Sequence, residues 1–370
     1  MFLHSVFPSQ QFCSEHFFAV IPEPGKNFLA EAESLMDEYR SAAAGSGCSE
    51  RSELLLRFHC SDIVNQAPIL RKLLGDRHSF VSMIGQPPAE GCRIVLEAWH
   101  ILPMKKHFSS SHSVCCEFQN YRFLLFEGGD SEAVGSHDQT AREFSELGSE
   151  LKKSGATVAG HTVRTWLYCR DVDNNYAGLV QARNRFFDTV GLTAQTHFIA
   201  STGIEGISAK PDRLVTMDSL SIPELERGQF FYLSAPKMLS PTALNNVRFE
   251  RGTRIIFGDR SQYYISGTAS IDKFGKVLYP DDVRAQTQRA LDNTEALLQA
   301  GGAGLSDLKQ ATVYMRDTAD ASIIREELKK RLPSGIPMVL LKAPVCRPAW
   351  LVEIESIAVN DRGGDFPPLI

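Results

Sequence analysis

The sequence repeats one pattern three times, and this repetition limits the possible folds more than any other feature. Near the end of each third, an apolar run closes on an Asp and is followed by a helical pattern, a second apolar run and a strand that carries an acid. The first runs occupy residues 54–62, 163–171 and 311–317, and the acid-bearing strands occupy 94–99, 214–220 and 351–357. Three such copies predict three supersecondary units that pack against one another.

Each unit also begins with a strand hairpin, clearest at 262–271, and an amphipathic helix. The spacing of apolar residues predicts these helices at 28–43, 140–154 and 283–300, and the later ones at 69–74, 176–190 and 322–332. For 283–300, Asp281 or Asp282 is the expected N-cap and Gly301 the stop. The order β-β-α-β-α-β predicts an α/β (α+β) protein with mixed sheets and helices outside. We place the units at 1–110, 111–222 and 223–370, the last including a connector.

The three acid-bearing strands differ at one of two positions that can hold an acid. The later acid is present in every copy, as Glu97, Asp218 and Glu355, which indicates a structural role. The earlier position holds Val95, Thr216 and Glu353 in turn. A carboxylate found in one copy of three is favoured as chemical, and Glu353 shares a strand face with Glu355 because side chains alternate along a strand.

Composition excludes several function classes. The net charge of -5 gives no general basic field for nucleic acid. Eight scattered cysteines without a CxxC pair favour reduced thiols, and no apolar run reaches the roughly 18 residues of a membrane span. The N-terminus lacks a basic region, so we expect a cytoplasmic protein. The His spacing supports no metal site and no phosphate-binding loop motif occurs, so we expect no cofactor.

Four segments of the third unit resemble the Rid family, also called YjgF or endoribonuclease L-PSP: 265–272, 286–293, 313–317 and 352–358. The resemblance weakens through the second unit to the first. Single-unit members form trimers with active sites between subunits. The resemblance therefore implies a monomeric pseudo-trimer, with further association left open.

The chain also resembles the chorismatases, which hydrolyse chorismate and release pyruvate. The motifs are Ser266-Gly267-Thr268, Val345-Cys346-Arg347 and Leu351-Val352-Glu353 in the third unit, and Arg164-Thr165-Trp166 and Ser201-Thr202-Gly203 in the second. The resemblance implies that Glu353 protonates the enolpyruvyl methylene group. It also implies that the residue at Cys346 helps to select the product.

Each candidate has a functional and a plain interpretation. Glu353 in an apolar setting would have a raised pKa and act as a proton donor, or it would be a solvated acid at a rim. Arg164 and Arg347 would clamp a dicarboxylate, or form surface ion pairs. The Ser266-Gly267-Thr268 and Ser201-Thr202-Gly203 turns would contact substrate, or simply end strands. Tyr264 would enter the cleft or pack as a strand aromatic, and Cys346, with no nearby His, would line the pocket.

The leading hypothesis is a cofactor-free hydrolase or lyase acting on chorismate or a related cyclic carboxylate, with a small carboxylate metabolite as its ligand. A Rid-type deaminase of enamines or imines is the first alternative. Rid deaminases carry a carboxylate-binding arginine where this chain has Met338, so its anchor would be altered. The second alternative is a non-catalytic pseudo-trimer that binds a metabolite or a partner protein.

Overall fold

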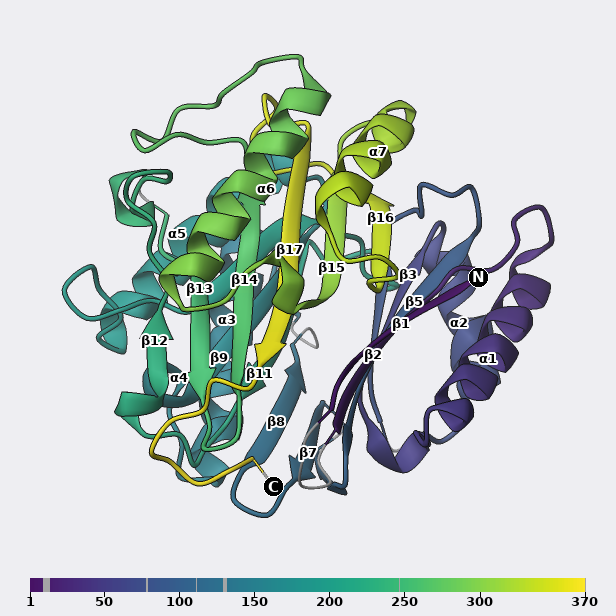
Figure 1. The fold of residues 1–370 in the computed structure, drawn as a ribbon, viewed down its shortest axis with the longest axis horizontal. Helices are drawn as coiled ribbons and strands as arrows, with labels where there is room; N and C mark the ends of the chain where they lie inside the picture. Colours follow the sequence, from purple (N-terminus) through teal and green to yellow (C-terminus); the bar gives the residue numbers. More distant parts are fainter. Residues whose placement is uncertain (9–13, 78, 111, 129–131, 246, 370) are drawn as a thin grey trace.

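The computed structural model describes residues 1–8, 14–77, 79–110, 112–128, 132–245 and 247–369, and folds them into three mixed sheets (Figure 1). The first sheet has the strand order β1-β2-β5-β3-β4. Its strands are β1 (Phe2–Phe7), β2 (Ser14–Val20), β3 (Glu53–Cys60), β4 (Phe80–Gly85) and β5 (Ile94–Leu102). Only the β3–β4 pair is parallel, because helix α2 (Ile63–Leu74) crosses between those strands.

The second and third sheets repeat this arrangement with one more strand each. The second has the order β10-β9-β11-β8-β7-β6 and the third β12-β13-β14-β17-β15-β16. The second contains β6 (Lys105–Ser110), β7 (Ser113–Glu117), β8 (Arg122–Glu127), β9 (Thr162–Cys169), β10 (Ala200–Glu205) and β11 (Val215–Ser221). The third contains β12 (Phe230–Tyr232), β13 (Gly252–Ile256), β14 (Ser261–Ala269), β15 (Leu308–Met315), β16 (Met338–Lys342) and β17 (Val352–Asn360). Strand β6 lies before residue 111 in sequence, but it pairs with β7 in the second sheet.

Helices cover the outer face of each sheet, as expected for this class (Figure 1). They are α1 (Phe28–Gly45) and α2 on the first sheet, α3 (Ser136–Lys153), α4 (Val158–His161) and α5 (Val172–Thr189) on the second, and α6 (Val283–Ala300) and α7 (Ala321–Arg331) on the third. Short 3-10 turns lie at Glu50–Ser52, Arg227–Gln229, Thr242–Asn245, Leu305–Asp307 and Thr318–Asp320. Two strands follow the second long helix of each unit. The predicted order β-β-α-β-α-β has one strand there, so each unit contains one strand more than predicted after this helix.

Helix α6 shows how local sequence sets these elements. The Asp282 carboxylate accepts a hydrogen bond of 2.9 Å from the Ala285 amide, and the helix ends at Gly301, so both predicted caps are confirmed. Its buried stripe includes Ala290, Leu291 and Leu297, each at most 1% exposed. Burying each leucine contributes roughly 1.5–3 kcal/mol, so the stripe holds the helix on the sheet.

The three units meet around a pseudo-threefold axis. Isolated backbone bridges join each pair of units, as Gly85 with Ile207, Ile204 with Val345 and Pro88 with Leu341. Aromatic and aliphatic side chains from all three inner sheet faces form one continuous core cluster. The predicted intramolecular pseudo-trimer is confirmed by this arrangement.

The three later acids close the contacts between units. Asp218 accepts hydrogen bonds from Arg57 and Ser82 of the first unit, at 3.4 and 2.6 Å. Glu355 accepts from Arg164 and Trp166 of the second unit, at 2.8 and 3.0 Å. Glu97 accepts from two residues of the third unit, Gln310 and Thr312, at 2.7 Å each. Their predicted structural role is therefore confirmed.

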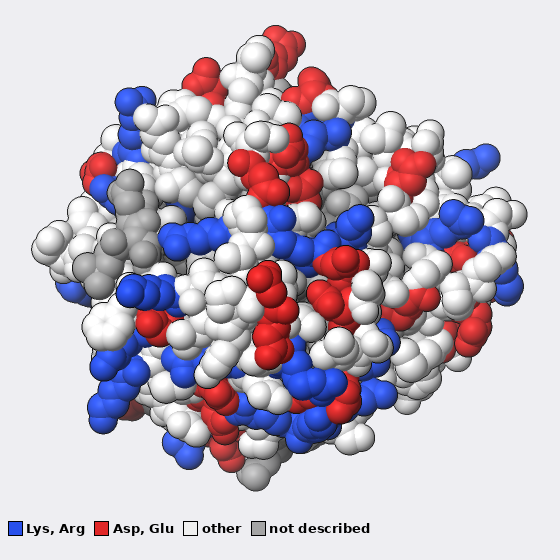
Figure 2. Space-filling model, turned by 90° about the horizontal axis from the view of Figure 1, so that it is seen from above, with Lys and Arg blue, Asp and Glu red and all other residues white. Residues whose placement is uncertain are grey.

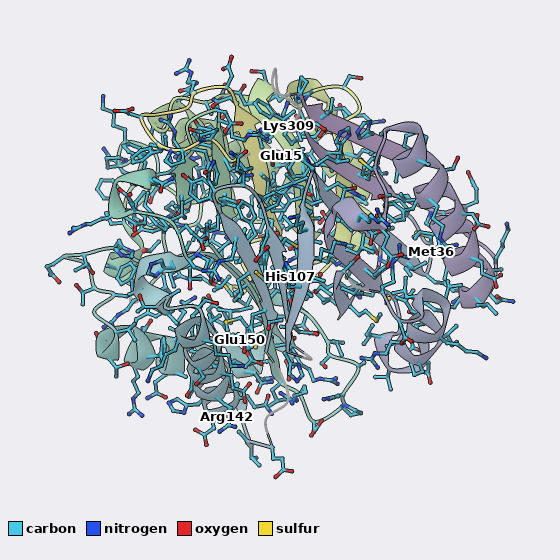
Figure 3. The ribbon with its side chains drawn as sticks, turned by 90° about the horizontal axis from the view of Figure 1, so that it is seen from below. Glu15, Met36, His107, Arg142, Glu150 and Lys309 are labelled. Atoms are coloured by element: carbon cyan, nitrogen blue, oxygen red, sulfur yellow. The ribbon has the colours of Figure 1, made fainter. Side chains whose placement is uncertain are left out.

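Polar contacts also fasten the N-terminal hairpin to the third sheet. Buried Glu15 of β2 accepts hydrogen bonds of 2.9 Å from Arg260 and Gln262. The Ser5 hydroxyl donates to the Lys309 carbonyl at 2.6 Å, and Figure 3 shows Glu15 and Lys309 together at this junction. The first unit is thus an integral part of the trimeric arrangement.

The surface agrees with the modest net charge. On the face shown in Figure 2, Lys and Arg side chains are interspersed with Asp and Glu. Each helix of the described residues is too short or too polar to cross a lipid bilayer. Cys13 lies outside the described residues, and the other seven cysteines are free thiols.

Candidate active site

A cavity lies between the second and third units. Helix α5 and strand β10 supply one wall, and β14, β17 and the loop at 343–351 supply the other. Neither unit alone builds this cavity. Its lining comprises Tyr176, Arg183, Ser201, Thr202, Gly203, Val247, Phe249, Arg251, Gly267, Ala269, Ile271, Cys346, Arg347, Trp350 and Glu353.

Glu353 is the acidic residue of this lining. Its side chain is 6% exposed, and no described side chain or backbone amide donates a hydrogen bond to its carboxyl group. Burial and, to a smaller extent, the charge of Glu355 together raise its pKa to about 8, while the charges of Arg251 and Arg164 oppose this rise. A carboxyl group in this state is protonated at neutral pH and can give up its proton within the cavity.

A β-bulge in β14 makes room for this carboxyl group. The register of β14 on β17 shifts between Ile265 and Thr268, so one extra residue is accommodated there. A Cβ atom added at Gly267 would overlap Oε1 of Glu353 and approach the Thr202 methyl group within 3.1 Å. Glycine at this position allows the close approach of Glu353, and a larger residue would have to displace the Glu353 carboxyl group.

We expect Gly267→Ala to destabilise the protein by about 1–3 kcal/mol, since overpacking of a buried site has this cost. Denaturant unfolding measures the change. Gly304→Ala is the matched control, because its Cβ would meet no atom nearer than 3.8 Å. In a protein that already carries Glu353→Ala, Gly267→Ala should cause little loss of unfolding free energy. An undiminished loss in that protein would contradict the proposed clash with Glu353.

Three guanidinium groups make the cavity cationic. Arg183 of α5 is 1% exposed, and its Nε and Nη2 atoms have no hydrogen-bond partner within the described part of the chain. Burial lowers the pKa of Arg251 to about 10, and among the described residues its guanidinium group donates to the Ser240 carbonyl alone, at 3.2 and 3.4 Å. Arg347 lies over the Trp350 ring, 5.0 Å from its centroid. One buried and two half-buried guanidinium groups with few partners suit an anionic ligand, above all a carboxylate.

Cys346 also lines the cavity, beside Glu353 and Tyr176. Burial raises the pKa of its thiol to about 12, and the negative charge of Glu353 acts in the same direction. The thiol is therefore protonated near neutral pH and is a poor nucleophile. This environment favours a pocket-lining role for Cys346.

The predicted hydroxyl-bearing turns fall into two groups. Ser201, Thr202, Gly203 and Gly267 line the cavity. Ser266 and Thr268 lie behind it: Ser266 accepts from the Ser201 amide at 2.9 Å and donates to the Glu250 carbonyl at 2.6 Å, while Thr268 donates to the Ser266 carbonyl at 2.8 Å. These two residues hold the strands together and do not face the ligand space.

Two residues that were predicted to contact the substrate lie outside the cavity lining. Arg164 does not line the cavity, because its buried guanidinium binds Glu355 at 2.8 Å and the Thr202 hydroxyl at 2.5 Å. Tyr264 packs near Trp99, with ring centroids 6.3 Å apart, and donates to Gln262 at 2.7 Å. Both side chains lie on strand faces that meet neighbouring units instead of the cavity.

The position that corresponds to the anchoring arginine of Rid deaminases is supplied to this cavity by the second unit and not by the third. Met338 is not part of the cavity lining. The residue in the equivalent register of the second sheet is Ser201, which pairs with Thr165 as Met338 pairs with Ala311. Because the cavity lies between units, the second sheet supplies this position to Glu353. At the junction of the first and second units, Thr216 occupies the place of Glu353.

Sequence reasoning missed Tyr176, Arg183 and Arg251. The first two are seven residues apart on α5 and therefore share its inner face. A charged residue at a core position of an amphipathic helix could have identified Arg183. Arg251 precedes β13 in an irregular segment, where no periodic pattern distinguishes it.

Comparison with known proteins agrees with this architecture. Residues 255–360 match the family described as Endoribonuclease L-PSP, which confirms the resemblance of the third unit. A crystal structure of chorismatase superposes over 83% of this chain and 93% of that one, with a TM-score of 0.65 and 20% identity. The chain has the chorismatase fold. The RidA structure from Psychrobacter covers 35% of this chain and 98% of its own, with 21% identity and a TM-score of 0.30.

A part of this chain is also similar in sequence to a curated protein. The 3-hydroxybenzoate synthase of Streptomyces hygroscopicus is 31% identical over 137 residues. That match covers 34% of this chain and 39% of the relative, so it spans about two fifths of the relative's length.

Proposed function

We propose that this protein hydrolyses chorismate, or a related cyclic enolpyruvyl carboxylate, and releases pyruvate. The observation that carries the proposal is the state of Glu353: a buried carboxyl group, without hydrogen-bond donors among the described residues, in a cavity with three guanidinium groups. The chorismatase fold and the likeness to a 3-hydroxybenzoate synthase support the same substrate class.

In the proposed reaction, Glu353 gives its proton to the methylene carbon of the enol ether. A C–H bond forms, the Glu353 O–H bond breaks, and the enolpyruvyl group of the substrate becomes an oxocarbenium ion. Water adds to this cation and returns a proton to Glu353. The hemiketal then collapses to pyruvate and a ring alcohol, so that the net change is the addition of one water molecule.

The cavity's guanidinium groups would anchor the substrate carboxylates during these steps. Arg183 is best suited, because two of its nitrogens are buried without partners and a carboxylate would satisfy both. Arg347 and Arg251 are available for the second carboxylate. Cys346 would shape the space beside the ring and so influence which product forms.

The direct test is incubation of the purified protein with chorismate, with pyruvate measured through a coupled lactate dehydrogenase assay. We expect release well above the spontaneous rate in buffer, and release that is slower by about 10²–10⁴-fold in the Glu353→Gln variant. Tight binding without release would overturn the proposal and favour the non-catalytic alternative.

A Rid-type hydrolase of reactive enamines is a second candidate, because the matched segment at 255–360 contains Glu353 and protonation of an enamine carbon needs the same acid. Ser201 stands where the anchoring arginine would be expected. Assays with 2-aminoacrylate generated in the reaction mixture separate the two, since we expect chorismate to be the better substrate.

Ionisation of the Glu353 carboxyl group should set the pH dependence of kcat/KM. Glu353 acts in its protonated form, and burial raises its pKa to about 8. Activity should therefore be retained below pH 8 and fall tenfold per pH unit above it. Initial rates from pH 6 to 10 check this, with the coupling enzyme in excess at each pH. A tenfold fall per pH unit that already begins at pH 6, as a carboxyl group with an ordinary pKa near 4.5 would give, would contradict a role for buried Glu353 as the acid.

A further inference from the structure

Glu355 lies on the same strand face as Glu353, two residues further along β17. A strand rises about 3.3 Å per residue, so the two residues are separated by roughly 6.6 Å along the strand. Both carboxyl groups are buried, with Glu353 6% and Glu355 4% exposed. Their surroundings differ, however. Arg164 Nη2 and Trp166 Nε1 donate to the two oxygens of Glu355, at 2.8 and 3.0 Å.

We propose that Glu355 is a positioning residue that keeps Glu353 in its acid form by holding a fixed negative charge beside it. The inference rests on the proposed role of Glu353 as proton donor. It identifies the residue that keeps Glu353 protonated before the reaction. It also gives Arg164 a function: this residue clamps one of the protein's own carboxylates, in place of the substrate.

Unequal hydrogen bonding decides which carboxyl group keeps the proton. Two neighbouring buried carboxyl groups resist being ionised together, because like charges in a poorly solvated region repel strongly. The donors on Glu355 stabilise its ionised form, whereas Glu353 has no donor among the described residues. Glu355 therefore carries the charge and Glu353 the proton.

Other charged and titratable groups also surround Glu353. They are Arg164 and Arg183 of the second unit, Tyr176 of α5, and Arg251, Cys346 and Arg347 of the third unit. The cations favour ionisation of Glu353. The charge of Glu355 raises the pKa of Glu353 by more than the charge of Arg251 or of Arg164 alone lowers it.

The pseudo-threefold repeat provides matched controls. Asp218 and Glu97 occupy the equivalent place in their strands and close the other two contacts between units. The residues two positions earlier are Thr216 and Val95, so neither acid has a carboxyl neighbour of this kind. A structural role is common to all three acids, and the electrostatic role belongs to Glu355 alone.

The test is a titration of Glu353 in the full-length protein without any substrate. Infrared difference spectra report the protonated carboxyl stretch, and the Glu353→Gln variant assigns it. In Glu355→Gln we expect the midpoint to fall by about one pH unit or more. In Asp218→Asn and Glu97→Gln it should not move. An unchanged midpoint in folded Glu355→Gln, or equal shifts in all three variants, would overturn the inference.

A second variant covers the case in which Glu355→Gln leaves Arg164 buried alone and fails to fold. Replacing both members, as Arg164→Gln with Glu355→Gln, removes the pair together, and we expect a smaller fall of the midpoint. No fall in the double variant would overturn the inference. Because the titration needs no turnover, a failure to release pyruvate from chorismate would count against the proposed function and leave this result standing.

Discussion

Glu353→Gln is expected to lower the turnover of chorismate by about 10²–10⁴-fold, the usual contribution of a positioned general acid. Glutamine has nearly the same size and fills the same space beside Gly267, but it has no acidic proton to give to the methylene carbon. Pyruvate release under saturating substrate measures the loss. Near-native circular dichroism would show that the fold is retained, and unchanged turnover would remove Glu353 from the mechanism.

The same variant should change the dependence of stability on pH. The folded-state pKa of Glu353 is raised to about 8, above its unfolded value near 4.5, so the folded state binds the extra proton between these limits. The wild-type protein therefore loses stability from this group as pH rises from 4.5 to 8, by an amount on the order of a few kcal/mol. Glu353→Gln cannot ionise, so its stability relative to wild type should rise over this interval.

Denaturant unfolding at pH 5 and pH 9 measures this difference. The result is independent of any substrate, because it depends only on the cost of ionising a buried carboxyl group. A constant difference between the two proteins across this range would show that Glu353 has an ordinary pKa in the folded state.

Arg183→Met is expected to reduce kcat/KM for chorismate by about 100-fold while leaving stability unchanged or improved. Truncating a charged partner of a buried carboxylate typically costs 2–5 kcal/mol of binding. In the free protein, however, two Arg183 nitrogens are buried without partners. Replacing an uncompensated buried charge with a well-packed apolar side chain removes a desolvation cost, so activity and stability should move in opposite directions.

Arg185 of the same helix is the matched control, because it is exposed and does not line the cavity. Arg185→Met should leave both kcat/KM and the unfolding midpoint near their wild-type values. Lost stability with retained activity in Arg183→Met would instead assign Arg183 to the core, as a structural residue.

The sequence alone determined the units and their most distinctive residue. Helical and strand periodicity, with caps such as Asp282 and stops such as Gly301, depend on near neighbours in the chain and therefore appear in any one copy. The threefold repeat then served as an internal comparison. It distinguished Glu353 from the acid shared by all copies without any knowledge of the cavity.

The tertiary structure alone decided which residues face one another. Periodicity assigns a side chain to a face, but the neighbour of that face depends on how the three units pack. The motif at Arg164 predicts a substrate contact, but packing directs its guanidinium group to Glu355. The resemblance to Rid deaminases predicts the anchor position at Met338, but the cavity is lined by Ser201 of the second unit, in the equivalent register. Arg183 and Arg251 reach Glu353 only because packing brings α5 and the segment before β13 to β17. These contacts join residues 102–170 positions apart, a separation over which local sequence patterns carry no information.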